Sequence, residues 1–252
     1  MKTFLKYDKP PLTAMIQCET ADECIKKIKK SLTDGADAFG IQLCVLKREY
    51  RDEETLKMIF SACGDKPIYA TSYRCKESEG MSDDECAELL LRALKCGATL
   101  LDVMGDAYDV SPQYQLAQSD TAIKKQKELI DKIHSLGGEV LMSSHTFKST
   151  TLEENLMIAK AHIERGADII KIVNNALSGD EIPKYIDIIQ KITAMTDKKL
   201  LFLVSGKGQI IRYIGPSFGV CMYLCVQEHG ELDKPEQPVL KKLKAVRDNI
   251  LF

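Results

Sequence analysis

Residues 166–173 read Gly-Ala-Asp-Ile-Ile-Lys-Ile-Val, a step from a helix stop into an apolar run. Its glycine follows a periodic helical pattern and stops the helix, because glycine adopts a left-handed backbone at no steric cost. The isoleucine and valine run that follows is typical of a strand. Similar steps from glycine into an apolar run recur at residues 35–37, 97–98 and 137–138. Helices that stop directly before strands predict βα units around a parallel sheet.

Outward from this stretch, the same alternation divides the whole chain. The predicted strands are residues 12–17, 39–44, 67–71, 99–103, 139–143, 168–173, 200–204 and 219–223. The predicted helices are residues 21–34, 52–63, 82–96, 120–136, 152–165, 180–195, 207–213 and 236–249. This count fits one TIM barrel, and no linker rich in proline, glycine or serine interrupts it. We therefore predict an α/β protein, a single (β/α)8 barrel domain over residues 1–252.

A doubly wound open sheet would show the same alternation of strands and helices. Its dinucleotide-binding fingerprint, G-x-G-x-x-G, does not follow the first predicted strand. The glycines of Ser205-Gly206-Lys207-Gly208 follow the seventh predicted strand, and they lack the Gly-Lys-Ser/Thr of a phosphate-binding Walker loop. These differences favour the barrel.

The composition of the chain argues against two classes of binding partner, nucleic acids and membrane surfaces. The chain has 35 basic and 37 acidic residues, and both kinds are spread along it. No basic or acidic segment suits nucleic acid or a membrane surface, so we expect neither as a partner. Residues 1–11 lack the apolar core of a signal peptide, which predicts a cytoplasmic protein. The nine cysteines are odd in number and scattered, so we expect reduced thiols and no metal site.

Lys171 is a candidate nucleophile because it interrupts the apolar strand predicted at residues 168–173. An unpaired buried ammonium is costly, and the common escape is loss of its proton. The neutral amine that results can attack a carbonyl carbon. On its position alone, Lys171 also fits a lysine that extends to the strand end or pairs with a carboxylate.

His145 is a candidate proton carrier because it comes directly after the strand predicted at residues 139–143. Histidine titrates near neutral pH and can take and return a proton within one turnover. On adjacent parallel strands, His145 and Lys171 would lie side by side on one face. The other histidines, His134 and His162 on predicted helices and His229 in a late loop, are weaker candidates.

Four segments carry a resemblance to a known family. Ser143-Ser144-His145-Thr146-Phe147 is similar to a Ser-Tyr-His-Asp-Phe motif, and Gly166 to Ile172 is similar to Gly-Ala-Asp…Lys-Ile. Gly208 to Arg212 is similar to Gly-x-x-Ser-Arg, with isoleucine for the serine, and Pro235-Glu236-Gln237 is similar to Pro-Gly-Gln. On these motifs the chain resembles the type I 3-dehydroquinate dehydratases of the shikimate pathway. The resemblance spans nearly the whole chain.

The resemblance implies a carbon–oxygen lyase of aromatic amino acid biosynthesis that dehydrates a hydroxy-ketone carboxylate without a metal or cofactor. Lys171 would form an imine with the substrate ketone, His145 would move the proton, and Glu79 would be an acidic catalytic partner. The implied substrate-binding residues are Arg212 and Gln237 at the carboxylate and Arg74 and Gln42 at the ring. On its position alone, Arg212 also fits an exposed charge on a helix. The family further implies a homodimer.

The chain departs from the family in the residues that would recognise the substrate. The family's strand-two Glu-x-Arg-x-Asp reads Gln42-Leu43-Cys44-Val45-Leu46 here, so all three charges are absent. The strand-four Asp-x-Glu reads Asp102-Val103-Met104. After strand three, the acidic residue is either replaced by Glu79, shifted by one inserted residue, or by Glu77, or it is lost. In the closing loop, Asp233 would repel a substrate carboxylate unless Lys234 offsets it.

These departures leave three alternatives open. The first is a paralogue that uses the same imine chemistry on another hydroxy-ketone. The second is a class I aldolase, in which Ser205-Gly206-Lys207-Gly208 would bind a phosphate. The third is a non-catalytic protein that keeps the barrel.

Overall fold

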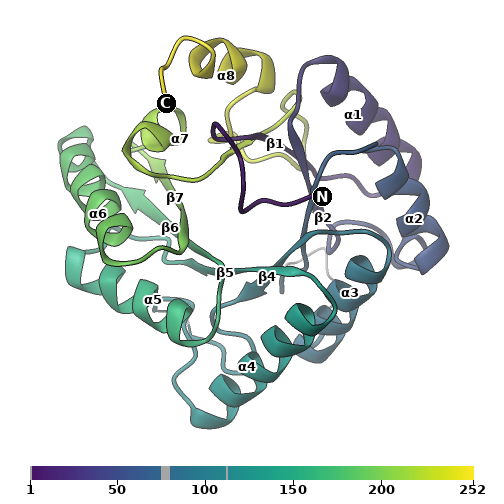
Figure 1. Ribbon diagram of the computed structural model, residues 1–252, viewed down its shortest axis with the longest axis horizontal. Coiled ribbons are helices and arrows are strands. Elements are labelled where there is room, and N and C mark those ends of the chain that lie inside the picture. The colour runs from purple at the N-terminus through teal and green to yellow at the C-terminus, as the bar shows by residue number, and fades with distance from the viewer. Residues whose placement is uncertain (1, 75–79, 112) are drawn as a thin grey trace. The chain divides into compact units, whose positions relative to one another are not determined.

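The computed structural model describes residues 2–74, 80–111 and 113–252, and its strands and helices alternate along the chain (Figure 1). The strands are β1 (Leu12–Ile16), β2 (Ala38–Gln42), β3 (Ile68–Thr71), β4 (Leu100–Met104), β5 (Glu139–His145), β6 (Ile169–Ala176), β7 (Lys199–Gly206) and β8 (Tyr223–Cys225). The helices are α1 (Ala21–Thr33), α2 (Glu53–Ser61), α3 (Asp83–Lys95), α4 (Asp120–Ser135), α5 (Leu152–Glu164), α6 (Ile182–Met195), α7 (Ile211–Ile214) and α8 (Leu240–Arg247). Each predicted strand and helix therefore has a counterpart.

Local sequence explains where the helices begin and end. Thr20, Ser82 and Thr151 precede α1, α3 and α5 and form capping boxes, in which the side chain of the cap and a glutamate three residues later satisfy free backbone amides. After α5, Gly166 has a φ of 100°, a left-handed conformation that favours glycine. This turn delivers the chain directly into β6.

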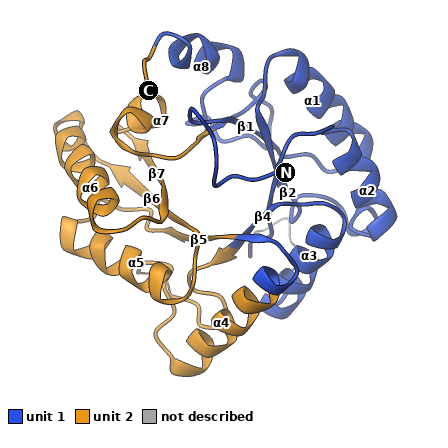
Figure 2. Ribbon diagram, viewed as in Figure 1, with its two compact units in different colours: residues 1–102, 133–139, 224–249 blue, residues 103–132, 140–223, 250–252 orange. Residues whose placement is uncertain are grey.

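The chain divides into two compact units (Figure 2). Unit 1 comprises residues 1–102, 133–139 and 224–249, and unit 2 comprises residues 103–132, 140–223 and 250–252. In unit 1, β1, β2, β3 and the first residues of β4 pair in parallel in chain order, with β8 beside β1. In unit 2, β5, β6 and β7 pair in parallel. The single domain over residues 1–252 stays a prediction.

Large buried side chains fill the core of each unit. Phe39 and Tyr69 are inaccessible to solvent in unit 1, as are Tyr185 and Phe202 in unit 2. The rings of Tyr185 and Phe202 lie 6.0 Å apart, so α6 packs on β7 through an aromatic contact. Within the described ranges, no helix is long and apolar enough to cross a membrane.

Several boundaries differ from the prediction. β5 continues through His145, which was predicted to lie just past the strand. β2 ends at Gln42, so Cys44 lies beyond it in a buried turn. The eighth strand begins at Tyr223, because residues 215–218 form a 3-10 helix and Gly219 follows with a φ of 114°. Helix α7 is a single turn and does not start at residue 207.

Candidate active site

Strands β5 and β6 place His145 and Lys171 on the same face of the sheet in unit 2. Their parallel register pairs Ser143 with Lys171 and His145 with Val173. Paired residues share a face, and so do residues two apart along one strand. The Cα atoms of His145 and Lys171 are therefore diagonal neighbours, roughly 8 Å apart on standard strand spacings. Both side chains are long enough to meet at one substrate.

The opposite face of these strands packs on helix α5. Ser144 Oγ lies 3.0 Å from Nε2 of His162, and the side-chain amide of Asn174 donates to Oδ1 of Asn155 at 3.0 Å. Because side chains alternate along a strand, His145 and Lys171 project away from α5. Lys171 is only 4% exposed. Its neighbour on β7 is Leu201, so the lysine stem has apolar surroundings on that side.

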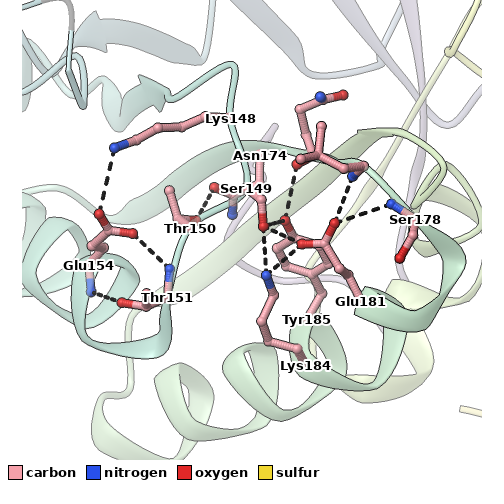
Figure 3. A network of polar contacts seen from close by, with 12 residues as sticks. Lys148, Ser149, Thr150, Thr151, Glu154, Asn174, Ser178, Glu181, Lys184 and Tyr185 are labelled. Carbon is pink, nitrogen blue, oxygen red and sulfur yellow. Dashed lines mark hydrogen bonds and ion pairs between the residues drawn. The ribbon is translucent and has the colours of Figure 1, made fainter.

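Asn174 fastens the loop that follows His145 (Figure 3). Its Oδ1 accepts hydrogen bonds from the hydroxyls of Thr146 and Thr150, at 2.9 Å for Thr146. The amide of Asn155 in turn donates to Thr150 Oγ1 at 2.8 Å. These buried polar groups satisfy one another, which fixes the backbone beside the histidine.

A second cluster in Figure 3 joins the same loop to α6. The carboxylate of Glu181 accepts from the ammonium of Lys184 at 2.7 Å, from the hydroxyl of Ser149 and from the backbone amide of Leu177 at 2.7 Å. Lys184 and then Ser149 are the main reasons that the pKa of Glu181 is lowered to about 2. The cluster therefore depends on a negative charge at Glu181.

Arg212 on α7 lies at the carboxyl end of β7. Its Nε donates to the carbonyl of Val204 and its Nη2 to Oγ of Ser205, each at 3.1 Å. Ser205 pairs with Asn175, so it shares the sheet face of Lys171. Arg212 is 8% exposed, and the alternative of an exposed helix-surface charge is wrong. A buried guanidinium held in this way suits a carboxylate ligand.

Gln42, Arg74 and Gln237 belong to unit 1. Arg74 forms an ion pair with Asp83 at the start of α3, and the Gln42 amide contacts Sγ of Cys44 at 3.6 Å. Oε1 of Gln237 accepts from the amide of Gln17 at 3.1 Å. Each predicted substrate-binding residue of unit 1 is thus already engaged by neighbours. Glu79 and Glu77 lie outside the described residues.

The charge of Asp233 is offset by Lys27 rather than by Lys234. Nζ of Lys27 lies 2.8 Å from Oδ2 of Asp233, whose side chain is 1% exposed. The amide of Gln17 also donates to Asp233, at 3.2 Å. Lys234 is exposed, so its predicted role is not needed. The ion pair joins the loop before α8 to α1.

Asp102, the aspartate of the strand-four motif, is bound by two tyrosines. The hydroxyls of Tyr69 and Tyr73 both donate to its Oδ2 in the core of unit 1. Burial, and next the nearby carboxylate, raise the pKa of Tyr69 well above its usual range. Both tyrosines therefore remain neutral donors, and Asp102 is held by the fold.

The remaining histidines lie as predicted along the chain. His134 is on α4 and His162 is on α5, while Nε2 of His229 lies 2.9 Å from the carbonyl oxygen of Gln237 in the loop before α8. Among the described residues, no cluster of three His, Cys, Asp or Glu side chains is arranged to hold a metal ion.

Comparison with known proteins identifies the family. The model of the type I 3-dehydroquinase family matches residues 12–250. The chain belongs to this family. It is a family of carbon–oxygen lyases, and the resemblance noted around His145 and Lys171 is thereby confirmed at the level of the family.

One curated relative is similar to part of the chain. The 3-dehydroquinate dehydratase of Syntrophotalea carbinolica is 28% identical over 162 residues, which cover 62% of this chain and 58% of that protein. The chain thus matches under two thirds of the length of this relative.

Solved structures of type I 3-dehydroquinases confirm the (β/α)8 barrel. The enzyme from Geobacillus kaustophilus superimposes with a TM-score of 0.81 at 17% identity, over 98% of this chain and 95% of its own. The enzyme from Clostridium difficile, solved with covalently modified comenic acid, gives 0.79 at 18% identity, over 96% and 92%.

The sequence did not predict one polar contact of His145. Gln115, in the loop between β4 and α4, places its Oε1 2.9 Å from Nδ1 of His145. The two residues are 30 positions apart, and the loop has neither helical nor strand periodicity. No motif in the sequence singles out this glutamine.

Proposed function

We propose that this chain is a dehydratase that forms an imine between Lys171 and a cyclic hydroxy-ketone carboxylate, with 3-dehydroquinate as the first candidate substrate. The observation that carries the proposal is the shared sheet face of Lys171 and His145, with Arg212 at the carboxyl end of the neighbouring strand. Family membership supplies the reaction class.

The proposed reaction balances as loss of one water. The amine of Lys171 attacks the ketone carbon, and the ketone oxygen leaves as water to give an iminium. The iminium acidifies the adjacent carbon, from which His145 removes a proton. The resulting enamine expels the β-hydroxyl group, and His145 returns the proton so that this group departs as water. The water released on imine formation is matched by hydrolysis of the product imine, which regenerates Lys171.

Arg212 would bind the substrate carboxylate. Its guanidinium is buried and offers several donors in one plane, which suits two oxygens at once. With this substrate, the reaction would belong to the shikimate pathway in the cytoplasm. We further propose, on the family resemblance alone, that the protein acts as a homodimer.

We also propose that the substrate pocket is altered. Gln42 is neutral, Cys44 is fully buried behind the end of β2, and Met104 is buried in β4. A lost charged hydrogen bond typically costs 1.5–3 kcal/mol, or roughly 10- to 150-fold in affinity. Turnover of 3-dehydroquinate is therefore expected to be slow relative to a related hydroxy-ketone that keeps the β-hydroxyl leaving group and lacks one other ring hydroxyl.

The experiment is a steady-state comparison of substrates. Formation of the conjugated enone is followed by ultraviolet absorbance, from 3-dehydroquinate and from analogues that keep the β-hydroxyl leaving group and each lack one other ring hydroxyl. A higher kcat/KM for one analogue supports the altered pocket. A kcat/KM of about 10⁴ M⁻¹s⁻¹ or more for 3-dehydroquinate itself, within the range of ordinary enzymes, contradicts it. Release of carbon–carbon cleavage products would favour the aldolase instead.

A further inference from the structure

We propose that Gln115 is a positioning residue that fixes His145 in the tautomer with its proton on Nδ1 and its lone pair on Nε2. The catalytic meaning of this contact rests on the proposed function of His145. The contact itself lies within unit 2 and involves the loop between β4 and α4.

The assignment of the proton follows from two contacts of one atom. Oε1 of Gln115 lies 2.9 Å from the backbone nitrogen of His145 and 2.9 Å from its Nδ1. The backbone N–H can only donate, so the atom facing it must be the amide oxygen rather than the amide nitrogen. An oxygen that accepts from the backbone can only accept from the ring as well. Nδ1 therefore carries a proton, and in the neutral ring the basic atom is Nε2.

Gln115 is itself held by groups behind the strand. The backbone carbonyl oxygen of Gln115 accepts a hydrogen bond from the hydroxyl of Ser144 at 2.8 Å. Ser144 Oγ in turn lies 3.0 Å from Nε2 of His162. Because the hydroxyl of Ser144 donates its proton to Gln115, the oxygen of Ser144 accepts a hydrogen bond from the ring N–H of His162. The backbone of Gln115 has a φ of 48°, which is uncommon for a residue other than glycine. Such a conformation persists where the surroundings enforce it.

Gly105 at the end of β4 allows this close approach. A Cβ atom there would lie 2.5 Å from the carbonyl oxygen of Gln115 and 2.7 Å from Oγ of Ser144. Any larger residue would push the loop off the strand. The carbonyl of Gly105 also accepts from Arg165 at 2.8 Å and from Gln126 at 3.0 Å, so α4 and the end of α5 secure the same point.

The amide suits a histidine that must cycle between two protonation states. A carboxylate in the place of the Gln115 amide would favour the imidazolium, whereas a neutral oxygen orients the ring without adding a charge. With the proton on Nδ1, Nε2 carries the lone pair that, in the proposed reaction, takes a proton from the substrate carbon and returns it.

The direct test is the tautomer of His145 in the substrate-free protein. Long-range ¹H–¹⁵N spectra of histidine-labelled protein, at a pH at which the ring is neutral, distinguish the two tautomers, and His145→Asn assigns the signal among the four histidines. The wild type is expected to show the Nδ1–H form. The Nε2–H form in the wild type would overturn the proposal.

Variants test whether Gln115 is the cause. Gln115→Met keeps the length of the side chain and removes the acceptor, while Gln115→Glu keeps an acceptor oxygen. Gln118→Met is the matched control, because Gln118 is an exposed glutamine of the same loop whose side-chain amide donates to the carbonyl of Leu116. Thermal unfolding of each variant reports on the fold.

We expect Gln115→Met to give a mixture of tautomers and to lower kcat about 10- to 100-fold with KM nearly unchanged, with Gln115→Glu recovering the Nδ1–H form. An unchanged tautomer in Gln115→Met, or a rise in KM with kcat unaltered, would contradict the inference. If the tautomer behaves as expected but no hydroxy-ketone is turned over, the positioning contact stands and the proposed function fails.

Discussion

Lys171 and His145 lie on one face of adjacent strands, offset by two residues in register and directed away from helix α5. The amine of Lys171 and the imidazole of His145 therefore project from the same side of the sheet. In the proposed reaction the two groups would have separate tasks, carbonyl attack and proton transfer, on neighbouring atoms of one substrate.

His145→Ala is expected to lower kcat by about 10²- to 10⁴-fold while KM changes little, because a general acid/base group acts mainly on the transition state. Steady-state kinetics on the best substrate measure this effect. His134→Ala is the matched control, since His134 is exposed on α4. An equal loss in both variants would assign His145 a structural role.

Lys27→Met is expected to destabilise the loop before α8, because Asp233 would keep a buried charge without its partner at 2.8 Å. Breaking a buried ion pair on one side costs about 3–5 kcal/mol at most, and the partial exposure of Lys27 reduces this figure. Urea unfolding should show a loss of stability that Asp233→Asn, added to Lys27→Met, largely restores. Lys26→Met, on an exposed neighbour, should be neutral. Failure of the double variant to recover would disprove the coupling.

The charge of Glu181 is expected to make the stability of the folded protein depend on pH. Its pKa is lowered to about 2 in the folded protein, first by Lys184, from an ordinary value of 4.5. Because the pKa of Glu181 is lower in the folded than in the unfolded protein, its charge stabilises the folded state when the pH is above the unfolded pKa. This stabilisation is lost as the pH falls from about 4.5 toward 2.

Glu181→Gln should therefore cost stability at pH 7, about 1 kcal/mol after allowance for solvent screening, and much less near pH 2. Urea unfolding at pH 7 and near pH 2 measures the difference. Glu153→Gln, an exposed carboxylate on α5, serves as the control and should show no such contrast. An equal loss at both pH values would rule out the charge as the cause.

Cys44→Arg is expected to lower the thermal midpoint strongly. Cys44 is inaccessible to solvent, and its carbonyl already accepts from the buried guanidinium of Arg51 at 3.0 Å. A second guanidinium would be overpacked, unpaired and close to a like charge. Gln42→Glu, at a partly exposed position, should change the midpoint far less. A Cys44→Arg variant as stable as the wild type would show that the turn after β2 can open.

The sequence predicted the features that repeat along the chain or depend on strand alternation. Glycine steps such as the one at Gly166 end helices, and apolar runs define the strands, so the order of elements was predictable. The shared face of Lys171 and His145 follows from two adjacent parallel strands. The predicted end of the second strand and the predicted start of the eighth strand were wrong, because an apolar run does not reveal where strand pairing stops.

Contacts between distant loops could not be predicted. Lys27 and Asp233 are 206 residues apart, and Gln115 reaches His145 through a left-handed backbone conformation that no residue type signals. Both contacts depend on how a loop folds back over a strand end. A single sequence contains no periodic pattern for that arrangement.

Borohydride reduction in the presence of 3-dehydroquinate and the same hydroxyl-deleted analogues, followed by peptide mass spectrometry, tests the proposed imine at Lys171 directly. The proposed mechanism predicts a stable adduct on the peptide that contains Lys171, and no adduct in Lys171→Met, whose side chain fits the same buried position. An adduct on another lysine, or turnover that continues in Lys171→Met, would contradict it.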